Sequence, residues 1–143
     1  RIRIYFNKKG KVIMKVEHII PELIVDNIEK MVEFFAKKFD FEVEAKDPEE
    51  GHYTWVQIVN GDNHIMMQET DVTKLEIPEL KARITGTDLL MLKLENADAV
   101  RNVYERFGNE LESVYMKIRV TEYGSCEFGV KDPEGRYIIV SGD

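Results

Sequence analysis

Two of the three histidines, His18 and His64, have the residue type and setting to ligate a metal ion. Each begins a segment of alternating apolar residues that is typical of a β-strand. Glu22 and Gln68, the further ligands that the pattern offers, each lie four residues after one of these histidines. Two histidines form no metal site without a third convergent donor, so this chemistry depends on how the strands pair. His52 follows Gly51 in a predicted turn and is expected to be exposed.

Aromatic residues offer a second kind of chemistry. Tyr53 and Trp55 alternate along the segment before the Asn60-Gly61 turn, so they are predicted to share one face of a strand. Aromatic faces stack on flat ligands and attract cations. The alternative is that Trp55 is a core residue.

The sequence lacks the residues that several other common chemistries require. The sequence contains no Ser-His-Asp set, no P-loop and no dinucleotide-binding glycine motif. Its one cysteine, Cys126, excludes an internal disulfide framework and a cysteine-rich zinc cluster. We expect Cys126 to be a small core residue in a protein of the reducing cytoplasm.

Composition indicates one soluble globular domain. The chain has 143 residues, of which 43% are hydrophobic and 33% charged, and no apolar run approaches the roughly 20 residues of a membrane span. Twenty Lys and Arg against twenty-seven Asp and Glu give a formal charge of -7. This charge disfavours nucleic acid and anionic lipid as partners.

The first thirteen residues differ from the rest, because they carry five basic residues and no acid. We expect residues 1–13 to be a dispensable leader, with the domain at 14–143 starting at Met14. In the alternative interpretation Ile2, Ile4 and Phe6 form an extra edge strand that pairs with a neighbour.

The domain itself shows a repeated pattern of one strand, one helix and three strands. In the first module, 15–70, the predicted strands are 19–25, 41–45, 53–59 and 64–69, with a helix from Ile28 to Phe39 capped by Asp26 or Asn27. In the second module, 86–142, they are 89–94, 113–120, 126–130 and 136–141, with a helix between Asn96 and Gly108. Residues 71–85 are predicted to be a linker with at most a short helical turn, because Pro78 interrupts it.

A constant offset relates the two modules. Adding 69 places Ile20 on Leu89, Asn27 on Asn96 and Phe35 on Tyr104. Strand, cap and helix face all coincide, so the sequence predicts an α+β fold of two βαβββ modules. Two such modules close an incomplete barrel around a cleft, the expected ligand site.

These motifs resemble the vicinal oxygen chelate superfamily, which includes glyoxalase I, the bleomycin-resistance proteins and the extradiol dioxygenases. The resemblance covers Lys15 to Ser141, and its carriers are Pro21-Glu22-Leu23-Ile24-Val25-Asp26-Asn27-Ile28, Phe34-Phe35, Tyr123-Gly124, Phe128-Gly129-Val130 and Asp132-Pro133-Glu134-Gly135. It implies a barrel-like cavity that is usually completed in a homodimer. Metal-dependent members place four ligands in that cavity, at positions that align here with Ile20, Met66, Leu89 and Ile139. None of the four suits a hard or borderline cation, so the sequence predicts no stoichiometric nickel, zinc, iron or manganese and no cofactor.

Strand alternation sorts the remaining residues into two faces. The apolar face, expected to lie under the helices, holds Ile19, Pro21, Leu23, Val25, Ile65, Met67, Leu90, Leu92, Leu94, Ile138 and Val140. The mixed face, where we expect a ligand to bind together with Tyr53 and Trp55, holds His18, Ile20, Glu22, Ile24, His64, Met66, Gln68, Leu89, Met91, Lys93, Tyr137, Ile139 and Ser141. The alternative is that this face is part core and part solvent.

The pattern closest to this sequence is that of the bleomycin-resistance proteins. The favoured hypothesis is therefore a homodimeric binding protein without metal catalysis, which sequesters a small aromatic or cationic molecule. One alternative is a metal-dependent glyoxalase-like lyase, isomerase or dioxygenase, which requires either a different strand register or the use of His18 and His64. Another is a structural or regulatory dimerisation domain.

Overall fold

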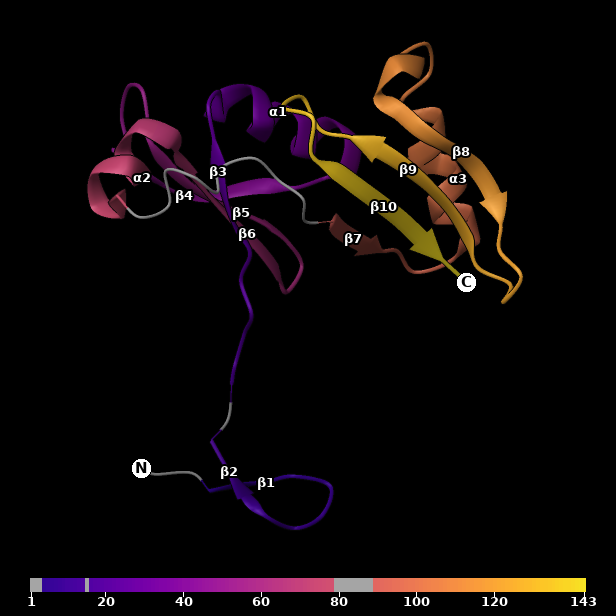
Figure 1. The fold of residues 1–143 in the computed structure, drawn as a ribbon, viewed down its shortest axis with the longest axis horizontal. Coiled ribbons are helices and arrows are strands. Elements are labelled where there is room, and N and C mark those ends of the chain that lie inside the picture. The colour runs from indigo at the N-terminus through magenta and orange to yellow at the C-terminus, as the bar shows by residue number, and fades with distance from the viewer. Residues whose placement is uncertain (1–3, 15, 79–88) are drawn as a thin grey trace.

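The computed structural model describes residues 4–14, 16–78 and 89–143, and within these it forms two similar α+β halves (Figure 1). The first sheet has the order β3-β6-β5-β4, from strands β3 (Glu22–Val25), β4 (Glu42–Asp47), β5 (Trp55–Asn60) and β6 (Asn63–Glu69). The second has the order β7-β10-β9-β8, from strands β7 (Leu89–Lys93), β8 (Val114–Val120), β9 (Cys126–Lys131) and β10 (Tyr137–Gly142). The pairs β3–β6 and β7–β10 are parallel, and the others are antiparallel. The predicted fold is confirmed.

The main helices begin where the caps predict. Helix α1 (Ile28–Phe39) starts after Asn27, whose Oδ1 accepts a hydrogen bond from the Lys30 amide at 3.1 Å. Helix α3 (Ala97–Glu105) starts after Asn96, whose Oδ1 accepts from the Ala99 amide at 2.9 Å. A short 3-10 turn, η2 (Leu111–Ser113), precedes β8. Both caps satisfy amides that a helix N-terminus leaves without partners.

The hydrophobic core lies between the sheets and the helices, as the alternation predicts. Val25, Ile65, Met67, Ile138 and Val140 are buried together with α1 and α3 side chains, and Cys126 is buried among them. Ile19 was predicted to join them and does not, because its side chain is 90% exposed. Strand β3 begins only after Pro21, which has no backbone N–H to extend the ladder.

A short helix follows the first sheet, where the sequence predicted at most a helical turn. Helix α2 (Thr70–Glu76) packs against β3 and β6, and its Thr73 is buried. The Thr73 hydroxyl donates to Gln68 Oε1 at 2.8 Å. The rest of the predicted linker, through residue 85, and the predicted module ends at 15 and 86–88 lie largely outside the described residues.

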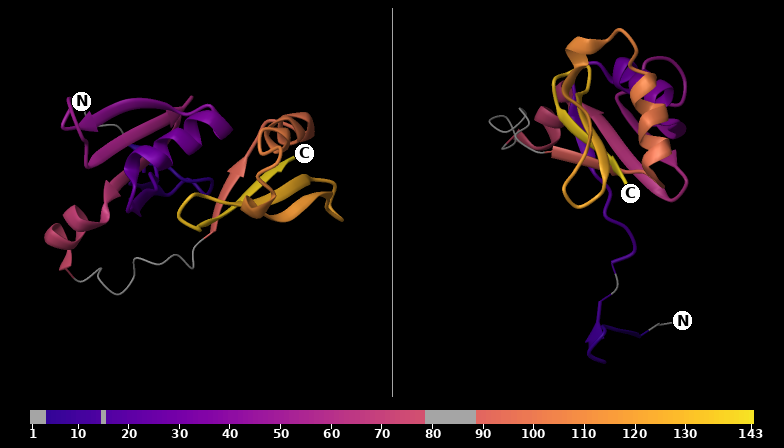
Figure 2. Two further views of the ribbon diagram at one scale, coloured as in Figure 1. Left: turned by 90° about the horizontal axis from the view of Figure 1, so that it is seen from above. Right: turned by 90° about the vertical axis from the view of Figure 1, so that its right-hand side faces the viewer.

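The two halves share one packed interface, and Figure 2 shows α1 and α3 on the same side of the molecule. The Phe107 ring of the second half contacts Phe34 and Phe39 of α1, at centroid distances of 6.2 and 6.3 Å. Arg106 also pairs with Asp40 at 3.0 Å. Aromatic packing and polar contacts therefore join the two modules.

The N-terminal segment forms a hairpin of its own, away from both sheets (Figure 1). Strand β1 (Tyr5–Phe6) pairs with β2 (Val12–Ile13) and, among the described strands, with no other. Residues 1–3 of the predicted leader lie outside the described residues. Within the described chain, no helix is long and apolar enough to cross a membrane.

Candidate functional site

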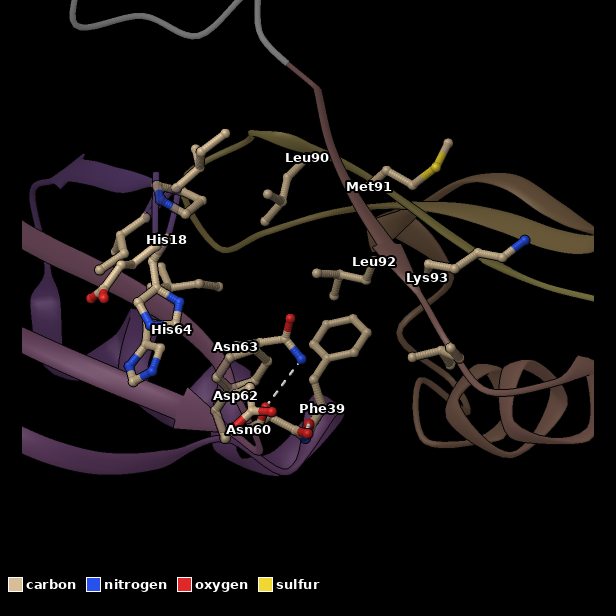
Figure 3. A pocket seen from close by; sticks show the side chains of 17 residues that line it. His18, Phe39, Asn60, Asp62, Asn63, His64, Leu90, Met91, Leu92 and Lys93 are labelled. Atoms are coloured by element: carbon tan, nitrogen blue, oxygen red, sulfur yellow. Dashed lines mark hydrogen bonds between the residues drawn. The ribbon is translucent and has the colours of Figure 1, made fainter. Parts of the chain in front are cut away.

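A cleft of about 530 Å³ lies between the inner edges of the two modules (Figure 3). Four segments line it: the chain before β3, the end of α1 with the residues that follow it, the β5–β6 turn with its flanks, and β7 with the residue after it. The first contributes His18 and Ile20, the second Phe39 and Phe41, the third Asn60 and His64, and the fourth the run from Leu90 to Leu94. Polar and apolar groups contribute about equally to its walls, and small-molecule sites combine the two kinds of group.

The cleft brings together five of the residues predicted for ligand binding, namely His18, Ile20, His64, Met91 and Lys93. The other predicted residues do not line it. Strand pairing sets Glu22 beside Met66 and Trp55 beside Gln68 in the first sheet, and Tyr137 beside Leu89 and Ile139 beside Met91 in the second. Tyr53 precedes β5 and packs against the hydrophobic core.

His18 and His64 meet at the edge of the cleft. Their ring centroids are 5.7 Å apart, and His64 Nδ1 lies 2.8 Å from the Gln57 amide nitrogen. The carboxylate beside His64 is that of Glu44, at 3.3 Å from Nδ1. Gln68, expected as a further ligand, instead hydrogen-bonds to Thr73 and Glu76 of α2.

The amino-acid sequence did not predict Glu44 beside His64, and the reason is physical. Strand β4 is irregular between Val43 and Ala45, where its register against β5 shifts. A bulge of this kind re-aims a side chain, and no local signal in the sequence marks it.

The open face of the second sheet carries an aromatic pair. Tyr115 and Tyr137 pack edge to face at a centroid distance of 4.9 Å, and Lys131 Nζ lies 5.2 Å from the centre of the Tyr137 ring. Gly129 makes room for this pair, because a Cβ there would come within 2.3 Å of the Tyr115 ring. Partial burial raises the pKa of the Tyr115 hydroxyl. The sequence predicted Tyr137 at this face but not Tyr115.

Another group of polar residues lies outside the cleft, where the β4–β5 loop meets α1 and the end of β6. His52 Nδ1 is 2.7 Å from Glu29 Oε1, and its Nε2 is 2.6 Å from Glu69 Oε1. Hydrogen bonds to Glu29 and then Glu69 raise the pKa of the His52 imidazole. The sequence predicted an exposed His52, and its side chain is 57% exposed, but it did not predict these partners.

The fold and the cleft define a class: paired βαβββ modules with a cleft between them. The sequence model of one protein family, the Glyoxalase/Bleomycin resistance protein/Dioxygenase superfamily, matches residues 15–140. The chain belongs to this superfamily. No curated protein matches it in sequence.

Solved structures agree with the fold. Lactoylglutathione lyase from Agrobacterium tumefaciens is 18% identical with a TM-score of 0.66, and the match covers 90% of this chain and 96% of that one. A bleomycin-binding protein complexed with bleomycin is 17% identical with a TM-score of 0.60, and the coverage is 90% and 99%. A glyoxalase/bleomycin resistance protein/dioxygenase family enzyme from Burkholderia phytofirmans PsJN is 14% identical with a TM-score of 0.69, and the coverage is 86% and 95%. At these identities the likeness shows the fold alone.

Proposed function

We propose that the protein binds a small aromatic or cationic molecule in the cleft between its modules and does so without metal catalysis. The observation that carries this proposal is the makeup of the cleft, where Leu90 and Leu92 point inward from β7 and His18 and His64 lie on the opposite wall (Figure 3). Burial of apolar surface supplies affinity, and isolated polar groups orient a ligand. The structure of similar fold that holds bleomycin supports a small molecule as the guest.

Charge supports a cationic or uncharged guest over an anionic one. Glu17 and Asp62 line the cleft. The cation there, Lys93, has a partner of its own, because its Nζ lies 3.0 Å from Asp143 Oδ1. The formal charge of -7 on the whole chain adds to this preference.

The residues at the family's metal positions support binding without metal catalysis. Ile20, Leu89 and Ile139 have no donor atom in their side chains, and Met66 offers only a soft thioether. Hard and borderline cations prefer oxygen, imidazole or thiolate ligands.

Thermal unfolding tests ligand binding. We would screen a panel of matched aromatic cations, neutral aromatics and aromatic anions, since a ligand that binds only the folded state raises the unfolding temperature. We expect the cations or neutral aromatics to raise it, and Ile20→Arg to abolish the shift by filling the cleft. Leu75→Arg is the matched control, because Leu75 lies on α2 and is 84% exposed. Equal shifts in both variants, or no shift with any probe, would contradict the proposal.

We also propose a homodimer. The side chains of Leu89 and Met91 in β7 are 60% and 58% exposed, and a second copy would cover this apolar edge. Cys126 is a buried free thiol, which supports a reducing cytoplasmic compartment. Sedimentation equilibrium should give twice the 16.7 kDa of one chain, and a single-chain mass at micromolar concentration would refute the dimer.

A metal-dependent lyase is the second candidate, favoured by the meeting of His18, His64 and Glu44. Elemental analysis after reconstitution with nickel, zinc, iron and manganese separates the two functions. The binding-protein proposal expects metal content to be the same in the wild type and in the double variant His18→Ala/His64→Ala. Metal that is lost in the double variant would establish the second candidate instead.

A further inference from the structure

We propose that Glu29, His52 and Glu69 form a divalent-cation site of the zinc class, separate from the cleft. The three residues come from the first turn of α1, the β4–β5 loop and the last residue of β6. One ligand atom from each lies within 4.8 Å of the others. One imidazole and two carboxylates are a donor set that suits zinc.

The hydrogen-bond geometry of the cluster calls for a positive charge between its two carboxylates, which either a protonated His52 or a bound cation supplies. A neutral imidazole has one N–H and can donate to only one carboxylate, yet both ring nitrogens of His52 face carboxylate oxygens, at 2.7 and 2.6 Å. Among the residues that the structure describes, no lysine or arginine forms an ion pair with Glu29 or Glu69. Within the described chain, the two carboxylates therefore converge on His52 without a lysine or arginine partner.

The second module shows that this convergence is not a requirement of the fold. Asp98 occupies the position of Glu29 in the 69-residue repeat, in the first turn of α3. Its carboxylate pairs with Arg101 of the same helix at 2.9 Å. In the first module the corresponding acid, Glu29, faces a histidine from a different segment, and that histidine also faces a second acid.

The cluster is partly preorganised for a metal. Glu69 is the most fixed member, because its side chain is only 20% exposed and its backbone amide donates to the Thr54 carbonyl at 2.9 Å. A tetrahedral zinc ion holds its ligand atoms about 3.4 Å apart, so a small contraction is needed. A metal takes one ring nitrogen, so the imidazole must also turn, and the exposure of His52 (57%) and Glu29 (51%) leaves room for both movements.

A metal ion here would tie the β4–β5 loop to α1 and to β6. That loop leads directly to Tyr53 and to Trp55, the single tryptophan. This role adds to the proposed ligand binding and does not depend on it. If the site binds zinc, the sequence-based expectation that the protein holds no metal applies to the cleft alone.

Isothermal titration of the metal-free full chain with zinc chloride tests the site, with magnesium chloride as the comparison. We expect one zinc ion per chain at micromolar affinity and no magnesium binding. His52→Ala should weaken zinc binding at least tenfold, and Glu69→Gln, which keeps the shape of the side chain, should weaken it in the same direction.

The other two histidines are the matched controls, since the chain has three in all. Zinc binding should be unchanged in His18→Ala and in His64→Ala. No binding below millimolar zinc would overturn the site and leave a protonated His52 as the group that joins the two carboxylates. Binding that survives both His52→Ala and Glu69→Gln, or that is lost in His64→Ala, would also overturn it.

Discussion

The two modules have the same buried side and different open faces. Under the helices, both sheets present aliphatic and aromatic side chains to a shared core. On the open side, the first sheet carries polar groups such as His64, Gln57 and Glu44. The second sheet instead carries Leu89 and Met91 and the Tyr115–Tyr137 pair. The repeat therefore preserves the residues that hold the modules together and varies those that meet solvent or a ligand.

This difference separates the requirements of folding from those of function. A buried position accepts only side chains that fill it, so duplicated modules keep their cores alike. An open face carries no such restriction, so its chemistry can follow a ligand. The largest expected effects of mutation therefore lie in the shared core.

The first prediction compares equivalent core positions of α1 and α3. Phe35 is fully buried, whereas Tyr104, its counterpart in the repeat, is only half-buried. We expect Phe35→Ala to lower the free energy of unfolding by about 3–5 kcal/mol, as for other buried aromatic truncations. Tyr104→Ala should cost about 1–3 kcal/mol, because its ring is already partly hydrated. Urea denaturation measures both losses, and equal losses would show that the helices contribute alike.

Much of this core could be predicted from sequence, but most of the site could not. Alternation and capping residues are local signals, so they located the two main helices, most strands and both caps, but not helix α2. The meeting of Glu44 with His64 depends on a bulge in β4, and that of His52 with Glu29 and Glu69 depends on how a loop docks. Register shifts and loop docking are set by distant contacts, which a single sequence does not display.

The second prediction concerns a carboxylate of the second module that contacts the start of helix α1 in the first module. The Glu134 carboxylate, in the β9–β10 turn, accepts hydrogen bonds from the backbone amides of Asp26 and Asn27 at 2.8 and 3.0 Å. Glu134 belongs to the opposite module, yet it places a negative charge at the N-terminus of α1. A negative charge is favourable at that end of a helix. We expect Glu134→Ala to lower the free energy of unfolding by about 1–3 kcal/mol.

The control for Glu134 is another acid that bridges the modules. Glu110 pairs with Lys38 at 3.2 Å, but its side chain is 57% exposed. Glu110→Ala should therefore cost less than about 0.5 kcal/mol. If the two variants lost equal stability, the contacts of Glu134 with the backbone amides would contribute no more to the free energy of unfolding than an exposed ion pair does.

The third prediction has the smallest effect and tests the symmetry of the repeat most directly. Asn27 and Asn96 cap α1 and α3 through the same kind of hydrogen bond, at 3.1 and 2.9 Å. Each Asn→Ala variant should lose about 1 kcal/mol, and Asn→Asp should retain most of the stability, because a carboxylate accepts the same bond. Denaturant unfolding of the four variants measures these differences.

The surroundings of the two caps decide whether that symmetry holds. The backbone amide of Asn27 is also bonded by Glu134, whereas the amide of Ala97, next to Asn96, is bonded by the Asp143 carbonyl at 2.9 Å. If the side-chain cap acts independently of these backbone contacts, the losses from Asn27→Ala and Glu134→Ala add in the double variant to within about 0.5 kcal/mol. A smaller combined loss would mean that Glu134 and the Asn27 side chain hold the start of α1 as one unit. In that case the two caps are alike in geometry and different in energy, because only one of them depends on the opposite module.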